Sequence, residues 1–323
     1  MNHDLMTLEL STTIPAGFLF SGPLRQKFRL QNTIDKSIFV QGFGFWTGED
    51  VTIEFRPSRP NSGIRFVRAD LAGHPRIPAL VQYRDEKPRQ TSLVKNEARV
   101  DMVEHVLAAV CALKIDNCEI WTDRPEMPGF DGSSIVFVSA LERAKVVSQP
   151  AIRPMRLVTR AFRIGSDNNW IDVLPSRNGQ NTYRYSLIVD SNYPIDNQEC
   201  SFDFSTEVFR REIADSRTFI TKHEAEYLLS RGLCRRVSPS DVLVLDVGGP
   251  VDNRFRYENE CARHKVLDMI GDFSLIDCDW IGTFESYRGS HSLNAECVRV
   301  LLENTILLDD SFVPGINRVK RAA

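Results

Sequence analysis

The sequence predicts an α+β fold made of two domains. Segments with strand character are followed by helices twice along the chain, once within residues 27–148 and again within residues 155–312. The chain has 323 residues, which is longer than one hydrophobic core normally serves. Its 42% apolar and 26% charged residues are typical of a globular protein. No repeat is visible residue by residue, so the likeness of the two halves is inferred from element order alone.

The first half begins with strands and ends with helices. Residues 51–55 alternate between apolar and polar side chains until Pro57, which predicts a strand. The glycine-rich segment 42–48 before it lacks the spacing and the following helix of a phosphate loop, so we interpret it as a turn between strands. The elements expected next are a helix capped near Asp101 and running to Leu113, a strand at 118–121, a loop at 124–134 and a helix ending near Lys145.

The second half repeats this order after a linker. Residues 146–154 contain two prolines and are the best candidate for that linker. The ends of the chain, 1–26 and 313–323, are expected to be an extension and a tail outside the two domains. The elements expected in the second half are strands at 155–164, 170–174 and 183–190, an α and β set over 207–247, the helix of His264 and a last helix over 293–303.

The composition excludes several classes of partner and location. A formal charge of −3 offers no general attraction to nucleic acid. Seven cysteines, an odd number without a C-x-x-C pair, favour a reducing compartment over a disulfide framework or a thiolate metal site. No apolar run is long enough for a signal-peptide core or a membrane span. We therefore expect a cytoplasmic protein.

His264 and Asp268 lie four residues apart on a predicted helix and so share one face. Asp272 extends the same polar stripe by one more turn. An imidazole and a carboxylate at this spacing can hold a divalent metal ion, with space for a third protein ligand and a water. The alternative is a solvated helix face with a His–Asp hydrogen bond, and the spacing alone favours that alternative.

Three more side chains would complete a hydrolytic site. His105 could be the third ligand, and the neighbouring Glu104 could take a proton from water. Asp101 and Glu104 also have the spacing of a capping box, which is the alternative role of Glu104. His291, before the last helix, could be a general acid if a carboxylate such as Asp272 raises its pKa. The alternative for His291 is an exposed loop residue.

Five segments resemble, in sequence and in order, the motifs of the UDP-3-O-acyl-N-acetylglucosamine deacetylase family. The likeness extends from about Gln31 to Leu302. Such a set of ordered motifs is far more specific than the single His-x3-Asp pattern. The segments are 103–109 (VEHVLAA), 131–133 (DGS), 216–219 (SRTF), 263–272 (RHKVLDMIGD) and 290–294 (SHSLN).

The resemblance implies a zinc-dependent amidohydrolase that removes acetate from UDP-3-O-acyl-N-acetylglucosamine in lipid A biosynthesis. It also implies a β-α-α-β sandwich of two related domains, with the active site in the cleft between them and a βαβ insert near residues 218–247. One Zn²⁺ is expected per chain, with Fe²⁺ or Co²⁺ as substitutes. The implied roles are metal binding by His105, His264 and Asp268, catalysis by Glu104, Thr218, Asp272 and His291, and substrate binding by Lys265, Phe219 and Arg288.

Departures from the family pattern concern the substrate. Trp46 stands where the family commonly has His, and Ser186-Leu187 replaces the acid and Phe that serve the uracil, so Tyr183 or Tyr185 is the candidate to stack on it. In the insert, the arginine pair 235–236 replaces small or apolar residues. It could narrow the entrance of the acyl passage or bind an anionic headgroup, and the alternative is that both side chains point to solvent. For Lys265, a solvated helix position is the alternative to a substrate contact.

The expected partner is therefore a UDP-linked acylated amino sugar. We expect a monomer, with any membrane contact made only through the acyl substrate. A second interpretation keeps the chemistry but changes the substrate to another N-acetylated sugar or sugar nucleotide. A third is a metal-binding paralogue without catalysis, against which the joint presence of Glu104, Thr218 and His291 argues.

Overall fold

The computed structural model describes residues 28–190 and 192–308 and has a mixed α+β architecture. The α+β class is therefore confirmed. Its first large sheet has the strand order β2-β3-β9-β4-β5, and only the β4 and β9 pair is parallel. The strands are β2 (Ile38–Phe43), β3 (Asp50–Pro57), β4 (Ile64–Arg68), β5 (Arg76–Pro78) and β9 (Cys118–Thr122).

The second large sheet has the same topology, with the order β12-β13-β20-β14-β15 and one parallel pair, β14 with β20, at the equivalent place. In each sheet, four strands follow one another in the sequence. The fifth, β9 or β20, comes later in the chain, between two helices, and lies in the middle of the sheet. The strands are β12 (Phe162–Ser166), β13 (Asn169–Leu174), β14 (Thr182–Leu187), β15 (Gln198–Asp203) and β20 (Thr283–Tyr287).

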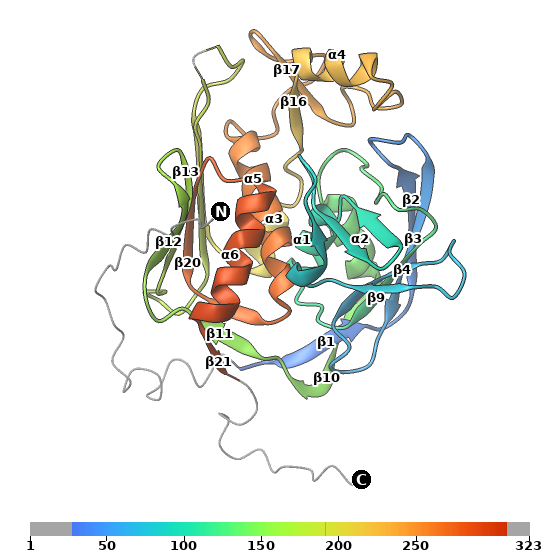
Figure 1. Cartoon of the computed structure of the whole chain (residues 1–323), viewed down its shortest axis with the longest axis vertical. Coiled ribbons are helices and arrows are strands. Elements are labelled where there is room, and N and C mark those ends of the chain that lie inside the picture. Colours follow the sequence, from blue (N-terminus) through green and yellow to red (C-terminus); the bar gives the residue numbers. More distant parts are fainter. Residues whose placement is uncertain (1–27, 191, 309–323) are drawn as a thin grey trace.

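The two sheets lie on opposite sides of a layer of helices (Figure 1). Each sheet turns its apolar face toward this layer; in β3, for example, Val51, Ile53 and Phe55 alternate with more exposed residues. The core therefore sits between the sheets. The helices of the layer are α1 (Glu104–Ala112), α2 (Ile135–Ala144), α3 (Thr206–Glu212), α5 (Glu260–Phe273) and α6 (His291–Asn304).

Helices α1 and α5 touch backbone to backbone at the centre of this layer. A Cβ atom on Gly271 of α5 would lie only 2.0 Å from the carbonyl oxygen of Glu104 in α1. Ala108 and Ala109 of α1 are fully buried and add little bulk to the helix. Small residues permit this approach, which brings the start of α1 against the side of α5.

A βαβ unit stands apart from the helical layer (Figure 1). It consists of β16 (Phe219–Thr221), α4 (Lys222–Ser230) and β17 (Leu243–Asp246), with β16 parallel to β17 and the short β18 (Gly249–Pro250) at the edge. Thr221 and Glu224 form a capping box at the start of α4. At the corresponding point of the first half lies a small sheet of β6 (Arg84–Asp85), β7 (Ser92–Lys95) and β8 (Ala98–Asp101).

Three predicted elements differ from the structure. The expected linker 146–154 is largely strand β10 (Val146–Ile152), which pairs with β1 (Leu30–Ile34) across more than a hundred residues of sequence. The expected strand 155–164 is two strands, because β11 (Met155–Leu157) joins β19 (Asp279–Ile281) and β21 (Ile306–Leu308) in a separate sheet. The first long helix begins at Glu104 rather than near Asp101, which belongs to β8.

The expected extension 1–26 and tail 313–323 lie outside the described residues. Within residues 28–190 and 192–308, no helix combines the length and the apolar character needed to cross a membrane. Two short 3₁₀ helices, Val81–Tyr83 and Ser274–Ile276, complete the secondary structure of the described residues.

Candidate metal and catalytic site

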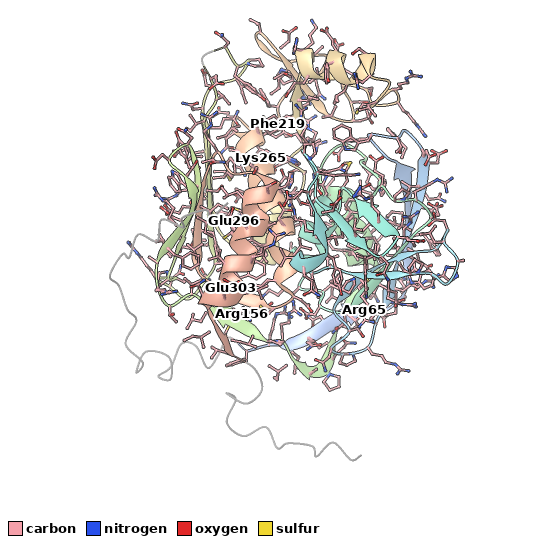
Figure 2. All side chains as sticks on the ribbon, in the orientation of Figure 1. Arg65, Arg156, Phe219, Lys265, Glu296 and Glu303 are labelled. Carbon is pink, nitrogen blue, oxygen red and sulfur yellow. The ribbon has the colours of Figure 1, made fainter. Side chains whose placement is uncertain are left out.

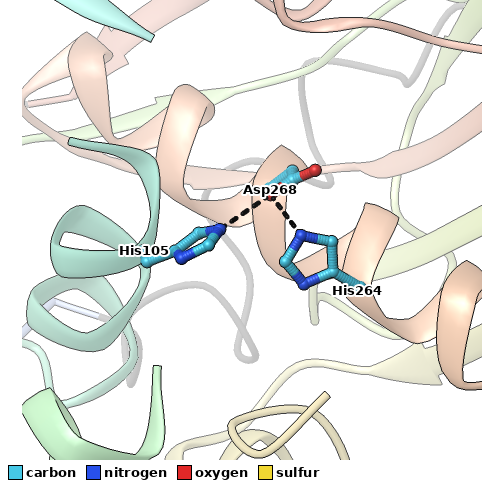
Figure 3. A group of neighbouring side chains, drawn as sticks. All are labelled: His105, His264 and Asp268. Atoms are coloured by element: carbon cyan, nitrogen blue, oxygen red, sulfur yellow. Dashed lines mark ion pairs between the residues drawn. The ribbon is translucent and has the colours of Figure 1, made fainter. Parts of the chain in front are cut away.

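His105, His264 and Asp268 meet where α1 contacts α5. The Nε2 atoms of His105 and His264 lie 3.6 and 3.3 Å from Oδ1 of Asp268 (Figure 3). Potential ligand atoms of the three side chains all lie within 4.8 Å of one another. Ligand atoms bound tetrahedrally to zinc at about 2 Å would be separated by about 3.3 Å. The observed spacing therefore suits one small divalent ion.

The chemistry of these three side chains also fits a metal ion. Oδ1 of Asp268 is buried and has no hydrogen-bond partner among the described residues. Nδ1 of His264 lies 3.1 Å from the carbonyl oxygen of Ser216 and can donate to it, which leaves the Nε2 lone pair for the cluster. Burial lowers the pKa of His264 to about 3, so its imidazole is neutral. A buried acceptor without a donor, beside a neutral imidazole, is what a divalent cation requires.

The interpretation of His264 and Asp268 as a solvated helix face is wrong. Their exposed fractions are 1% and 3%, and α5 is buried on almost every side. The helix face that carries them packs against α1 instead of meeting water. Sequence periodicity could not reveal this, because the covering helix ends 148 residues before α5 begins.

Glu104 is not part of a capping box. Its Oε2 accepts a hydrogen bond of 2.9 Å from the backbone N–H of Thr91, and Asp101 instead pairs with Lys87. Burial raises the pKa of the Glu104 carboxyl above its usual value. The side chain is thus a buried carboxyl with an elevated proton affinity, next to the candidate metal ligand His105.

His291 is the first residue of α6, not an exposed loop residue. Its Nδ1 lies 2.8 Å from Oδ2 of Asp272, which also accepts a hydrogen bond from the side-chain amide of Asn294. Burial alone would lower the pKa of His291, but the charge and hydrogen bond of Asp272 raise it to about 9. The imidazole is therefore protonated at neutral pH.

These groups line one end of a cavity of about 620 Å³. Glu104, His105, His264, Asp268 and His291 all contribute to its walls, together with Thr218 and Phe219. The remainder of the cavity is mostly apolar and is formed chiefly by the βαβ unit and the turn between β2 and β3, with residues 87–89 and 289–292 also contributing. The apolar lining includes Phe45, Trp46, Ile220, Leu228, Leu229, Val237, Val242 and Val244.

Lys265 belongs to the cavity, so its interpretation as a solvated helix lysine is wrong. Its Nζ donates to Oδ2 of Asp268 at 2.9 Å and lies 5.5 Å from the ring centre of Phe219. Figure 2 shows Phe219 and Lys265 close together, where β16 approaches α5. Burial would lower the pKa of Lys265, but the charge of Asp268 raises it. Arg288 differs, because its side chain is half exposed near Asp190 and does not line the cavity.

The tyrosines and the arginine pair that were expected to contact the uracil and the acyl chain do not line the cavity. Tyr183 and Tyr185 are buried in the core, hydrogen-bonded to Trp280 and to the Gly289 carbonyl, so neither ring is available for stacking on a base. Trp46 does line the cavity. Arg235 and Arg236 are exposed and do not line the cavity, which confirms the alternative that they point to solvent; Arg236 also binds the exposed Asp50 at 2.5 Å.

Thr91 is a site residue that the sequence analysis missed. It is fully buried, and its backbone and side chain bind Glu104 and Asp272. It lies outside every motif quoted above, and its segment, QTSLV, reads only as the start of a strand. No local signal in the sequence distinguishes it from an ordinary strand threonine.

Comparison with known proteins identifies the family of this chain. The family model described as UDP-3-O-acyl N-acetylglycosamine deacetylase matches residues 31–303. UDP-3-O-acyl-N-acetylglucosamine deacetylase of Myxococcus xanthus is 34% identical over 276 residues, 85% of this chain and 87% of the relative. The enzymes of that name from Brucella melitensis biotype 2 and Brucella ovis are each 34% identical over 277 residues, 85% of this chain and 96% of the relative. This chain therefore belongs to the UDP-3-O-acyl-N-acetylglucosamine deacetylase family.

Proposed function

We propose that this protein hydrolyses the acetamide of UDP-3-O-acyl-N-acetylglucosamine, releasing acetate and UDP-3-O-acyl-glucosamine for lipid A biosynthesis. The observation that carries the proposal is the meeting of three metal-ligand side chains, a buried carboxyl and a protonated imidazole at one end of a largely apolar cavity. Family membership supplies the substrate, and the site supplies each group that amide hydrolysis needs.

The cofactor is one Zn²⁺ per chain, held by His105, His264 and Asp268, with Fe²⁺ or Co²⁺ as substitutes. When bound, such an ion acidifies water and polarises a carbonyl oxygen as a Lewis acid. Asp268 offers Oδ1 to the ion, since Oδ2 is bound to Lys265. The Ser216 carbonyl keeps Nε2 of His264 directed at the same point.

Glu104 is the general base. Its carboxylate takes the proton from the attacking water as the C–O bond forms to the acetamide carbonyl. The raised pKa of Glu104 makes this transfer more favourable than it would be for an exposed glutamate. The N–H of Thr91 fixes one carboxylate oxygen, so the other is left to face the water.

His291 is the general acid. An amine leaves an amide only if the nitrogen is protonated as the C–N bond breaks. His291 is a protonated group at the cavity wall with a pKa of about 9, so it gives up its proton more readily than Lys265, whose pKa is raised above its ordinary value. Asp272 holds the ring through Nδ1, so Nε2 carries the proton that is donated. Thr218, also in the cavity wall, is assigned to stabilise the oxyanion of the tetrahedral intermediate.

The substrate is bound along the rest of the cavity. Lys265 provides a positive charge and Phe219 an apolar ring beside the reacting group, and the apolar walls suit an acyl chain. Arg288 remains assigned to the phosphates, from a position at the rim next to the lining residue Gly289. Any membrane contact would be made through the acyl substrate alone.

The domain arrangement is part of the proposal. We assign residues 27–148 and 155–312 to two related domains, with the insert near 218–247 and the site in the cleft between the domains. The matching strand orders of the two large sheets support this division. A cytoplasmic location is supported by the seven cysteines, all of which are free. A monomeric state remains a prediction.

A second candidate function is the same deacetylation on a different N-acetylated sugar or sugar nucleotide. The observation in its favour is the burial of Tyr183 and Tyr185, which leaves the uracil without the expected stacking partner. A paralogue without catalysis has less support, since it would need neither Glu104 nor His291 in the positions they occupy.

One experiment separates these functions. Metal content and acetate release are measured on the purified protein with UDP-3-O-acyl-N-acetylglucosamine, the same nucleotide without its acyl chain, and acylated N-acetylglucosamine without UDP. The proposal predicts bound zinc and release from the first substrate. Preference for another sugar would support the second function, and bound metal without any release would support the third.

A further inference from the structure

Thr91 contacts both the proposed general base, Glu104, and Asp272, the carboxylate that orients the proposed general acid, and it does so through different atoms. Its N–H donates to Oε2 of Glu104 at 2.9 Å, and its hydroxyl donates to Oδ1 of Asp272 at 2.5 Å. Its carbonyl accepts a hydrogen bond of 3.2 Å from the N–H of Val103, the N-cap of α1. One buried residue thus contacts the base, the start of the helix that carries it, and the carboxylate behind His291.

We propose that Thr91 is a positioning residue that fixes the general base and the general acid relative to each other. Glu104 and Asp272 come from different halves of the chain, since Glu104 is on α1 while Asp272 is on α5. Thr91 precedes β7 and is not part of either helix. The inference rests on the proposed deacetylation for the roles of Glu104 and His291, but the contacts of Thr91 do not depend on it.

The hydroxyl of Thr91 has a specific task at Asp272. Oδ2 of Asp272 accepts from both His291 and Asn294, whereas within the described part of the chain Oδ1 is bound only by the Thr91 hydroxyl. A carboxylate held at both oxygens cannot turn about its Cβ–Cγ bond. Without the hydroxyl, Asp272 would lose its second anchor, and with it the orientation that keeps Nε2 of His291 directed at the leaving nitrogen.

The contact with Glu104 is made by the backbone, so a side-chain substitution leaves it in place. Thr91→Val keeps the shape and the N–H but removes the hydroxyl, and Thr91→Ser keeps the hydroxyl and the N–H. The pair of variants therefore tests the contact with Asp272 and His291 separately from the contact with Glu104. Thr91→Val should impair amine departure while leaving metal binding and water activation intact.

The first test is kinetic and uses the zinc-loaded full-length protein. Thr91→Val is expected to lower kcat by about 10- to 100-fold, with KM and zinc content unchanged, and Thr91→Ser to stay within about threefold of the wild type. The loss should be smaller on an analogue carrying a 2-acetoxy group, because an alkoxide leaves with less need of a proton than an amine. In the His291→Gln background, Thr91→Val should add almost nothing, since both act on one step.

The second test does not need turnover. The Nδ1 proton of His291, hydrogen-bonded to Asp272, is observed by NMR of histidine-labelled protein. Its resonance should be preserved in Thr91→Ser and shifted or lost in Thr91→Val, with melting temperatures reported for both. This readout tests Thr91 even if the wild type releases no acetate, an outcome that would refute the proposed function alone.

Three results would overturn the inference. One is an unchanged Nδ1 resonance in Thr91→Val. Another is an equal loss of rate on the amide and the 2-acetoxy analogue, additive with His291→Gln, which would show that Thr91 only supports the structure. The third is loss of zinc from Thr91→Val, which would place its effect at the metal ligands.

Discussion

Gly271→Ala should disrupt the metal site without touching a ligand. The added Cβ would lie 2.0 Å from the carbonyl oxygen of Glu104 and 2.8 Å from its carbonyl carbon. An ordinary contact begins near 3.4 Å, so α1 and α5 must separate by about 3.4 − 2.0 = 1.4 Å at this point. The obstacle is backbone on both sides, so no side-chain rotation can relieve it.

The separation acts directly on the ligands. His105 follows Glu104 at the start of α1, while His264 and Asp268 belong to α5, so the shift changes the distance between the ligands. It amounts to about two thirds of the length of a Zn–N bond of about 2 Å. We expect overpacking to cost about 1–3 kcal/mol of unfolding free energy. A displacement of about 1 Å at a reacting group is also expected to lower kcat/KM by roughly 100-fold.

The assay combines zinc affinity by competition with a chelator, the melting temperature and acetate release. Gly248→Ala is the matched control: no atom lies within 4 Å of its added Cβ, although its φ of +97° makes the substitution strained. The control should lose some stability but keep zinc and activity. If Gly271→Ala binds zinc and turns over like the wild type, the close contact of α1 with α5 does not position the site.

Three further predictions concern the proton transfers and the insert. Glu104→Gln should keep zinc and lose about 10²- to 10⁴-fold in kcat, because the amide still accepts from Thr91 but cannot take a proton; loss of zinc would contradict this. The kcat/KM of the zinc-loaded enzyme should fall as pH rises through about 9, where His291 loses its proton. On the acid side, kcat/KM should fall at a pH above 4.5, because burial raises the pKa of Glu104. An alkaline limb near pH 6.5 would exclude His291 as the general acid. Arg236→Ala should broaden the range of acyl lengths accepted, because it frees the insert from Asp50. Stability should change little, since a surface ion pair contributes about 0–1 kcal/mol. Arg235→Ala is the control, and identical acyl-length profiles for the two variants would exclude a role of the Arg236–Asp50 pair in acyl selection.

The sequence predicted what depends on local spacing and failed where distant segments meet. His264 and Asp268 could be paired because four residues span one helical turn. From its residue type alone, His105 was only a possible third ligand, and the family resemblance was needed to favour it, since no local rule shows that α1 covers α5. The capping-box alternative for Glu104 failed because an amide 13 residues earlier, that of Thr91, binds its carboxylate instead.

The same limit explains the fold. Alternation in residues 51–55 marked β3 correctly, because a strand with one buried face has a period of two. Residues 146–154 looked like a linker because two prolines interrupt them, yet most pair with β1 as an edge strand, where a proline is tolerated. The partner strand lies at the other end of the first half, so only the folded chain could reveal the pairing.

The identical strand order of the two large sheets has an evolutionary consequence. This is the arrangement expected of a chain that arose by duplication of one ancestral unit, with α1 and α5 as counterparts that each precede the inserted strand, β9 or β20. In the proposed site, one copy supplies Glu104 and His105, and the other His264 and Asp268. Neither copy holds a complete set, so this form of the chemistry could be selected only after the two units had come together.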